Sequence, residues 1–191
     1  MIFQFSIYTI GGNKVARDMK EVIAMAAKKL LIEKGVKKLT VKDIVEECQI
    51  TRQAFYYHFE DIPDLFRWIF EQDTERTILE AKSLDSGEAK LRCLFIFGIN
   101  SMPYVKRGLE CNYRDELEKY LTQYIQRLFE RACDEEGLYP NCTRYEAGLI
   151  LRYHSQAILG LMRNWTEADT KNLEQIVHTV FCLMTEGIPP L

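Results

Sequence analysis

The sequence predicts an all-α fold. Glycine and proline are scarce, at ten and five among 191 residues, which leaves few turns to separate many short strands. Apolar residues recur at spacings of three and four along most of the chain, as on one face of an α-helix. With 47% hydrophobic residues, a chain of this length can bury a core without disulfides, in one domain or two small ones.

The first expected helix covers residues 17–34. Asp18 and Glu21 near its start and Lys34 near its end suit the helix dipole, and Gly35 is placed to end it as a left-handed cap residue. Its buried face is expected to consist of the apolar residues at helical spacing, Met19, Ile23, Ala26, Ala27, Leu30 and Leu31.

Two short helices joined by a tight turn are expected next. Thr40 is a suitable N-cap for the first of them, with Asp43 at the capping-box position, and this helix is expected to end near Cys48. Thr51 is a suitable N-cap for the second, which covers residues 52–58. This arrangement predicts a helix-turn-helix.

Five further helices are expected. The first begins near Asp61, has Pro63 in its first turn, where a missing amide costs little, and runs to about Lys82. After a break at residues 83–87, the next is expected to end before Pro103, leaving 103–113 irregular or as a short helix.

The last three expected helices have recognisable ends. A long amphipathic helix ends at Gly137. The capping box of Thr143 and Glu146 opens the next, which runs to about Asn164. The last is expected over residues 169–186.

The helix at 52–58 has the pattern of a DNA-recognition helix. Arg52, Gln53, Tyr56 and Tyr57 span an arc of about 140°, and Phe55 points away from it. That arc can enter a major groove while the opposite side packs on the preceding helices. Arginine can pair with guanine O6 and N7, and glutamine with adenine N6 and N7. Adjacent tyrosines cannot both face one core, so at least one should be exposed.

Phosphate contacts are expected around this arc. The hydroxyls of Tyr56 and Tyr57 suit phosphates, and their rings suit thymine methyls. Lys42 and the amide-bearing helix ends capped by Thr40 and Thr51 can hold phosphate oxygens.

The charge distribution also indicates a nucleic-acid module. The chain has a net charge of -3, yet residues 13–42 contain nine lysine and arginine residues against three acidic ones. A basic first part on an acidic whole is typical of a small DNA-reading domain attached to another domain.

Residues 17–70 resemble the TetR family of transcriptional regulators. The shared pattern is a threonine-capped helix, a turn and a helix ending in aromatic-Tyr-x-His-Phe, filled here by Thr40, Ile44, Ile50, Thr51, Phe55, Tyr56, Tyr57, His58, Phe59 and Leu65. Within this family, the segments Thr51–Phe59 and Leu65–Phe70 resemble those of the branch that regulates dihydroxyacetone-kinase operons. Three positions depart from the pattern: Gln49 replaces a turn glycine, Ala54 a hydroxyl residue, and Ile62 a lysine often aimed at phosphate.

The resemblance implies a helix-turn-helix DNA-binding domain at 13–60 and a helical ligand-binding and dimerisation domain at 61–191. It also implies a cytoplasmic homodimer, joined through the last two helices, that acts on double-stranded operator DNA as a repressor or an activator. An unknown small molecule or partner protein would act on the second domain. No cofactor is implied. His58 is expected beside a phosphate or the first helix, although a pH-sensitive or metal-binding histidine is the alternative.

Two other groups of residues have open interpretations. Polar-tipped aromatic and arginine side chains can line an inducer pocket or simply pack between helices: Tyr104, Arg107, Tyr113, Arg114, Tyr120 and Tyr124. Four cysteines and two histidines can form a metal or redox sensor, although cysteines are usually core residues: Cys111, Cys133, Cys142, Cys182, His154 and His178. We therefore predict no metal site.

Other function classes lack support. The sequence has no P-loop, dinucleotide-binding glycine pattern, metalloprotease helix or nucleophile elbow, so an enzyme is not expected. No apolar run reaches the roughly 20 residues that a membrane helix needs, and the apolar start lacks a basic region, which favours a cytoplasmic protein. The rival is a co-activator or adaptor that keeps the helix-turn-helix but acts through protein–protein contacts, in line with Ala54 and Ile62.

Overall fold

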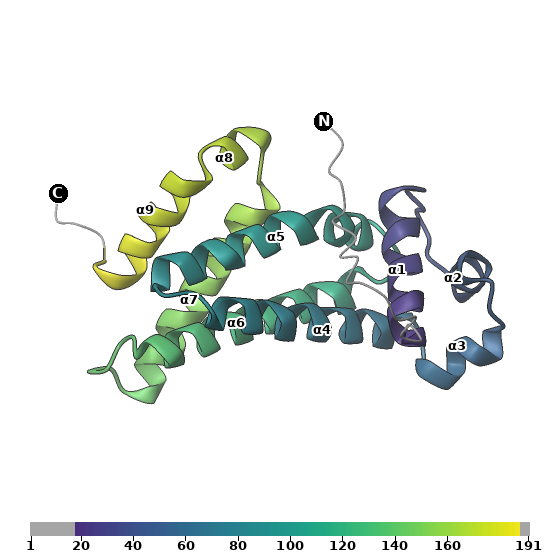
Figure 1. Cartoon of the computed structure of the whole chain (residues 1–191), viewed down its shortest axis with the longest axis horizontal. Helices are drawn as coiled ribbons and strands as arrows, with labels where there is room; N and C mark the ends of the chain where they lie inside the picture. The colour runs from purple at the N-terminus through teal and green to yellow at the C-terminus, as the bar shows by residue number, and fades with distance from the viewer. Residues whose placement is uncertain (1–17, 188–191) are drawn as a thin grey trace, which may run out of the picture.

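The structure is a computed structural model, and it describes residues 18–187. That part of the chain is helical and contains no strand, which confirms the all-α prediction. Its helices, seen in Figure 1, are α1 (Met19–Ile32), α2 (Val41–Cys48), α3 (Arg52–His58), α4 (Ile62–Lys82), α5 (Gly87–Leu109), α6 (Arg114–Glu136), α7 (Arg144–Arg163), α8 (Glu167–Lys171) and α9 (Leu173–Thr185).

Helices α1, α2 and α3 form a head at one end of the molecule (Figure 1). Asp18 caps α1 by accepting a hydrogen bond from the Lys20 amide at 3.1 Å. Gly35 has the predicted left-handed conformation, with φ at +56°, but it lies two residues beyond the C-cap Glu33, because α1 ends at Ile32. Fully buried side chains join the three helices to one another and to the loop before α2: Ile23, Ala27, Leu31, Leu39, Ile44 and Phe55.

The turn between α2 and α3 depends on local caps. Thr40 and Asp43 form the predicted capping box, and Thr51 accepts a hydrogen bond from the Ala54 amide at 3.1 Å. Gln49 adopts φ 58° and ψ 40°, a left-handed conformation that favours glycine. Gln49 therefore adopts the left-handed conformation at the position where similar proteins have a turn glycine.

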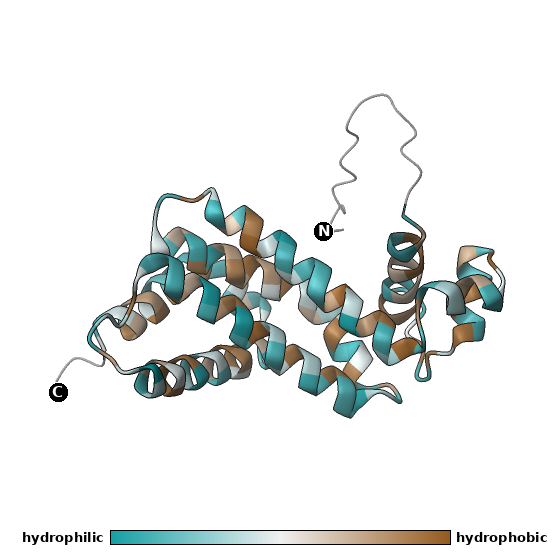
Figure 2. Cartoon of the chain, turned by 90° about the horizontal axis from the view of Figure 1, so that it is seen from below, coloured by the Kyte–Doolittle hydropathy of each residue, from teal (hydrophilic) through white to brown (hydrophobic). Residues whose placement is uncertain are grey.

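The helices from α4 onward form an elongated body. Helices α4, α5 and α6 run lengthwise and pack on one another, with α7 against α5 and α6 and with α9 against α5. Hydrophobic and hydrophilic residues alternate along these helices, as expected for amphipathic elements (Figure 2). The head joins the body where α1 packs on α4 and α5, and one hydrophobic core runs through both parts.

The prediction that a helix ends before Pro103 is wrong. Helix α5 continues through Pro103 to Leu109, so 103–109 is neither irregular nor a separate helix. Pro103 lies on the exposed side, where its missing amide removes one helix hydrogen bond. Its neighbours Met102 and Tyr104 are buried in the core, and this packing keeps the chain helical against local preference.

The prediction of one last helix at 169–186 is also wrong in part. The segment is divided at Asn172 into α8 and α9. Thr166 and Asp169 form a capping box that starts α8 two residues earlier than expected, and the Asn172 side chain donates to the Ala168 carbonyl at 2.9 Å to close it. In the described part of the chain, no helix is both long enough and apolar enough to span a membrane.

Candidate DNA-binding surface

Helix α3 presents the predicted polar arc to solvent. Arg52 and Gln53 are exposed, and Tyr56 and Tyr57 are 56% and 85% exposed. Phe55 is fully buried on the opposite side of the same helix. The structure therefore brings together on one surface the four side chains that the sequence assigned to base and phosphate contacts.

Aromatic packing holds α3 in place behind this arc. Phe55 contacts Phe59 with ring centroids 5.9 Å apart, and Phe59 contacts Trp68 of α4, also at 5.9 Å. The Lys20 ammonium of α1 lies 5.4 Å from the centre of the Phe59 ring. Because the short helix is anchored to both α1 and α4, its exposed arc has a defined orientation.

The predicted phosphate-contact residues flank the arc. Thr40 is half-buried, and its hydroxyl donates to the Asp43 carboxylate at 2.5 Å while accepting from the Asp43 amide at 3.2 Å. Lys42 is exposed, with Glu46 at 3.8 Å, and Thr51 is exposed at the start of α3. The half-buried His58 ring stands edge-on to Tyr57 at 5.0 Å.

Several lysines of the basic segment serve the head itself. Lys29 and Lys34 both donate to Glu47 at 2.6 Å. The hydrogen bonds from these two ammonium groups, Lys29 first, hold the pKa of Glu47 down to about 2. Lys28 is paired with Asp73 of α4. Only part of the local positive charge is therefore available to a nucleic acid.

The loop before α2 provides cations that our candidate set did not single out. Lys37 and Lys38 are exposed, and neither forms an ion pair with any residue from 18 to 187. They precede the Thr40 cap by three and two residues, and this nearness to a helix start expected to hold phosphate was the signal in the sequence that could have identified them. Lys14 and Arg17 of the basic segment lie outside the described residues.

The residues suggested for an inducer pocket do not share one cavity. Tyr104 lies in a groove between α1, α4 and α5, and Tyr124 lines a small cavity elsewhere. Arg107 pairs with Glu110 at 3.1 Å on the surface. Tyr113 packs near Phe66, with ring centroids 6.5 Å apart. The half-buried Tyr120 and the exposed Arg114 line neither of these two spaces.

The cavity beside Tyr124 is enclosed by α4, α5, α6 and α7. Its volume is about 50 Å³, and its lining is almost wholly apolar. The lining residues include Phe70, Leu94, Phe95, Met102, Leu121, Leu128, Ile158 and Met162. This cavity can accept an apolar group but offers few polar contacts.

The cysteines and histidines are dispersed. Cys133 is buried, which raises the pKa of its thiol to about 11. Burial lowers the pKa of His154. His178 approaches Glu88 at 3.1 Å with its Nδ1 and Cys182 at 3.7 Å with its Nε2. Within residues 18–187, no three histidine, cysteine or acidic side chains are placed to share a metal ion.

A second surface of interest lies on α7. Leu149, Tyr153 and Leu161 are 47%, 67% and 45% exposed, and with Ala157 and Gly160 they span an arc of about 120°. A groove between α7 and the α8–α9 segment is lined by Ala157, Gly160, Leu161, Asn164, Trp165, Asp169 and Ile176. An exposed apolar arc of this kind is typical of an interaction surface.

Comparisons with known proteins agree with this geometry. Residues 23–69 match the family model described as "Bacterial regulatory proteins, tetR family". The HTH-type dhaKLM operon transcriptional activator DhaS of Lactococcus lactis subsp. lactis (strain IL1403) is 37% identical over 145 residues, 75% of this chain and 77% of the relative. The HTH-type transcriptional repressor BepR of Brucella suis biovar 1 (strain 1330) is 34% identical over 73 residues, 37% of this chain and 35% of the relative.

A solved structure has the same fold. The dihydroxyacetone kinase operon activator DhaS superimposes with a TM-score of 0.63 at 22% identity, over 88% of this chain and 95% of that structure. The matched family model covers the head with its exposed α3, and the similarity to DhaS extends through most of the body. The chain is therefore a member of the TetR family of transcriptional regulators, and it resembles the DhaS branch.

Proposed function

We propose that the chain regulates an operon by binding double-stranded operator DNA with α3. Arg52 and Gln53 contact base edges, and Tyr56, Tyr57 and His58 contact phosphates and thymine methyls. Thr40, Lys42 and Thr51 hold the neighbouring backbone phosphates. The observation that carries this proposal is the exposure of the polar arc on a helix whose opposite side is fixed by Phe55 and Phe59.

The proposed active form is a homodimer joined through α7 and α9. The exposed apolar arc of α7 and the adjoining groove favour packing against a second copy. Two copies would place their α3 helices in successive major grooves, about 34–36 Å apart. We assign residues 13–60 to DNA binding and residues 61–191 to dimerisation and effector binding.

An effector acting on the body would control DNA binding by changing the separation of the two α3 helices. The apolar cavity between α4, α5, α6 and α7 is one place where a small molecule could act; a partner protein is the alternative. The relatives include an activator and a repressor, so either direction of regulation is compatible with this design. The site described contains no constellation for catalysis, and we propose no enzymatic step.

An adaptor acting mainly through protein contacts is the second candidate function. Ile62, which stands where the family often has a phosphate-directed lysine, is 2% exposed and belongs to the core. Ala54 offers no hydroxyl to DNA. Both positions therefore lack a contact that strengthens DNA binding in similar proteins.

DNA binding by purified full-length chain separates the two functions. An operator selected from random duplexes is expected to bind with an affinity that falls steeply with salt, and Tyr56→Ala with Tyr57→Ala should weaken binding by at least 100-fold. The variant Leu79→Ala removes an exposed side chain of α4, outside both proposed interfaces, and tests for general effects. Failure to select any duplex would favour the adaptor, and an unchanged affinity of the α3 variant would remove α3 from the interface.

A further inference from the structure

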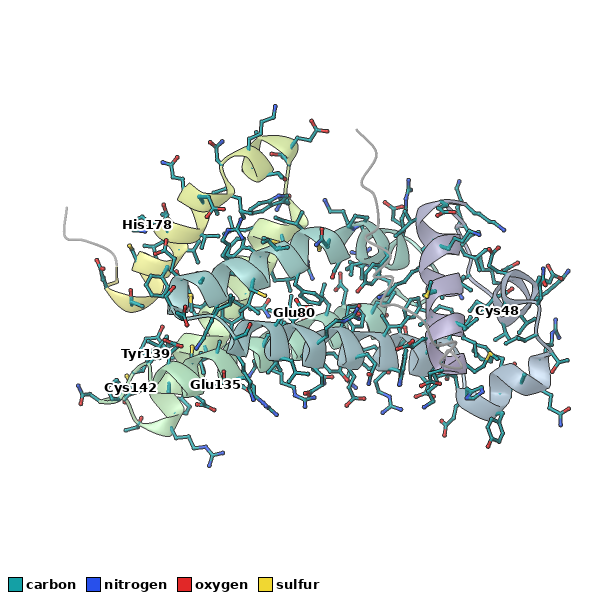
Figure 3. All side chains as sticks on the ribbon, in the orientation of Figure 1. Cys48, Glu80, Glu135, Tyr139, Cys142 and His178 are labelled. Carbon is teal, nitrogen blue, oxygen red and sulfur yellow. The ribbon has the colours of Figure 1, made fainter. Side chains whose placement is uncertain are left out.

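A large groove lies where the head meets the body. It has a volume of about 570 Å³ and runs between α4 and α5, with α1 at one end. Lys28 and Ile32 of α1 line the end near Asp73 and Tyr104, whereas the far end is lined by residues such as Glu80 and Arg92. Figure 3 shows Glu80 between the ribbons of α4 and α5. This volume is within the range of small-molecule sites and is separate from the apolar cavity of the body.

The head end of the groove is built on a buried carboxylate. Asp73 is 7% exposed, and its Oδ2 accepts hydrogen bonds from the Lys28 ammonium at 2.7 Å and from the Tyr104 hydroxyl at 2.8 Å. Its Oδ1 accepts a hydrogen bond from the Arg76 guanidinium at 2.6 Å. The carboxylate is therefore satisfied by three donors from three helices.

These contacts leave an excess of hydrogen-bond donors at the groove. An ammonium carries three N–H donors and a guanidinium five, and within residues 18–187 Lys28 and Arg76 each use one of them on Asp73. Asp73 itself has little accepting capacity left. A ligand that completes this end of the groove must therefore bring acceptor oxygens and negative charge.

The middle of the groove is apolar. Ile96 and Phe97 of α5 line it beside Cys93, and Asn100 and Ser101 follow about one turn nearer to Tyr104 and the charged end. A molecule with an anionic head and an apolar body would place the head at Lys28 and Arg76 and bury the body against these side chains. A purely ionic ligand would leave this part of the groove unfilled.

We propose that this groove binds a small organic anion, through a carboxylate or phosphate head at Lys28 and Arg76 and an apolar body along α5. Because Lys28 belongs to α1 and Arg76 to α4, the ligand contacts the DNA-binding head and the body at once. The ligand and Asp73 share the Lys28 ammonium, so occupancy alters the contact that holds α1 on the body. The regulatory consequence rests on the proposed DNA-binding function, whereas binding itself does not.

Binding is testable on the full-length chain without DNA. Saturation-transfer NMR titrations would compare phenylacetate and phenyl phosphate with 2-phenylethanol, which has a similar apolar group and no charge. Fragments of this size are expected to bind with dissociation constants below about 5 mM, and the alcohol at least ten-fold more weakly than the better anion. Binding of phenylacetate alone or of phenyl phosphate alone would identify the head group that the site prefers.

Variants locate the site. Arg76→Gln should weaken anion binding at least five-fold, whereas Arg67→Gln should leave it unchanged. Arg67 is a matched control because it also lies on α4 and pairs with an aspartate three residues earlier, Asp64. Asn100→Trp fills the groove from its exposed side and should abolish binding, with thermal unfolding used to verify that each variant is folded.

Three results would overturn the proposal. The first is that neither anion shows binding at concentrations up to 5 mM, about the limit of the dissociation constant given above for such fragments. The second is that Arg67→Gln weakens binding as much as Arg76→Gln does. The third is that folded Asn100→Trp binds the anion with the affinity of the parent chain. The last result would assign the ligand to another cavity. Since no operator is present in these titrations, their outcome is independent of whether α3 binds DNA.

Discussion

Asp73 links the head to the body through polar contacts with Lys28. It lies on the apolar face of α4, one turn after Ile69, and both are buried. A buried carboxylate is tolerated only when donors replace its water, and here Lys28, Arg76 and Tyr104 do so. An acidic residue at this position of an apolar stripe was the sequence signal for the groove, although the sequence did not reveal its partners on other helices.

The Tyr104 hydroxyl is expected to contribute to stability through Asp73. Burial, followed by the Asp73 charge, raises the pKa of Tyr104 well above its usual value of 10, so the hydroxyl stays protonated and donates. Tyr104→Phe removes one donor to a buried charge and should lower the free energy of unfolding by about 2 kcal/mol, measured by urea denaturation. The control Tyr120→Phe alters a half-buried tyrosine without a hydrogen bond to residues 18–187. Equal effects of both variants would rule out this role for Asp73.

Glu47 should make the head sensitive to acid. Its pKa is lowered from 4.5 to about 2 by Lys29 and Lys34, so the folded state binds a proton less readily than the unfolded state. The corresponding stability is present above pH 4.5 and is lost as the pH falls towards 2. Urea midpoints of the parent chain should therefore fall more steeply over this interval than those of Glu47→Gln. Because the side chains of Lys29 and Lys34 are exposed, 0.5 M salt should reduce the difference. Parallel pH profiles at low salt would contradict the assignment.

At the scale of helices, the sequence predicted the starts and most of the ends, and it failed at Pro103 and at the break between α8 and α9. Thr40, Thr51 and Thr143 were each assigned as N-caps, and each accepts the expected amide hydrogen bond, because a cap is specified by residues three positions apart. The continuation of α5 past Pro103 depends instead on packing against other helices. That information is not local. Whether the six candidate pocket residues share one cavity is also decided by packing between helices, and the fold distributes them over different surfaces.

Pro103 should be a point of lost stability within α5. Its exposed position allows the ring to be replaced without opening the core, and Pro103→Ala restores an amide that can bond to the Ile99 carbonyl. The variant should raise the free energy of unfolding by about 1–3 kcal/mol, measured by thermal and urea unfolding. Lys106→Ala, at an exposed position of the same helix whose side chain has no hydrogen bond or ion pair to residues 18–187, controls for general effects of added alanine. A loss of stability in Pro103→Ala would mean that the packing of α5 depends on the proline ring.

At the scale of the whole molecule, the DNA-binding head and the apolar face of α7 lie at different parts of an elongated chain (Figure 1). One α3 reads only one half-site, so the sequence specificity of the proposed regulator depends on how α7 and α9 pair two chains. The head was recognisable from sequence because its contacts are concentrated in some forty residues. The pairing surface was recognisable only in part, since exposure of α7 depends on how α5, α6 and α9 pack.

Charge on the centre of the α7 face should separate the proposed dimer while leaving each head intact. Tyr153→Glu with Ala157→Glu places two carboxylates on the exposed arc, where burial against a second copy would be unfavourable. Light scattering should then give the mass of one chain, 22.4 kDa, and affinity for a two-half-site operator should fall by roughly 10²–10⁴-fold because the second half-site no longer benefits from linkage. Affinity for an isolated half-site should stay the same.

Leu79→Glu, at a 67% exposed leucine of α4, should remain dimeric. A two-chain mass for the α7 variant would place the pairing surface elsewhere on the body, and monomers from both variants would show that any added charge dissociates the dimer.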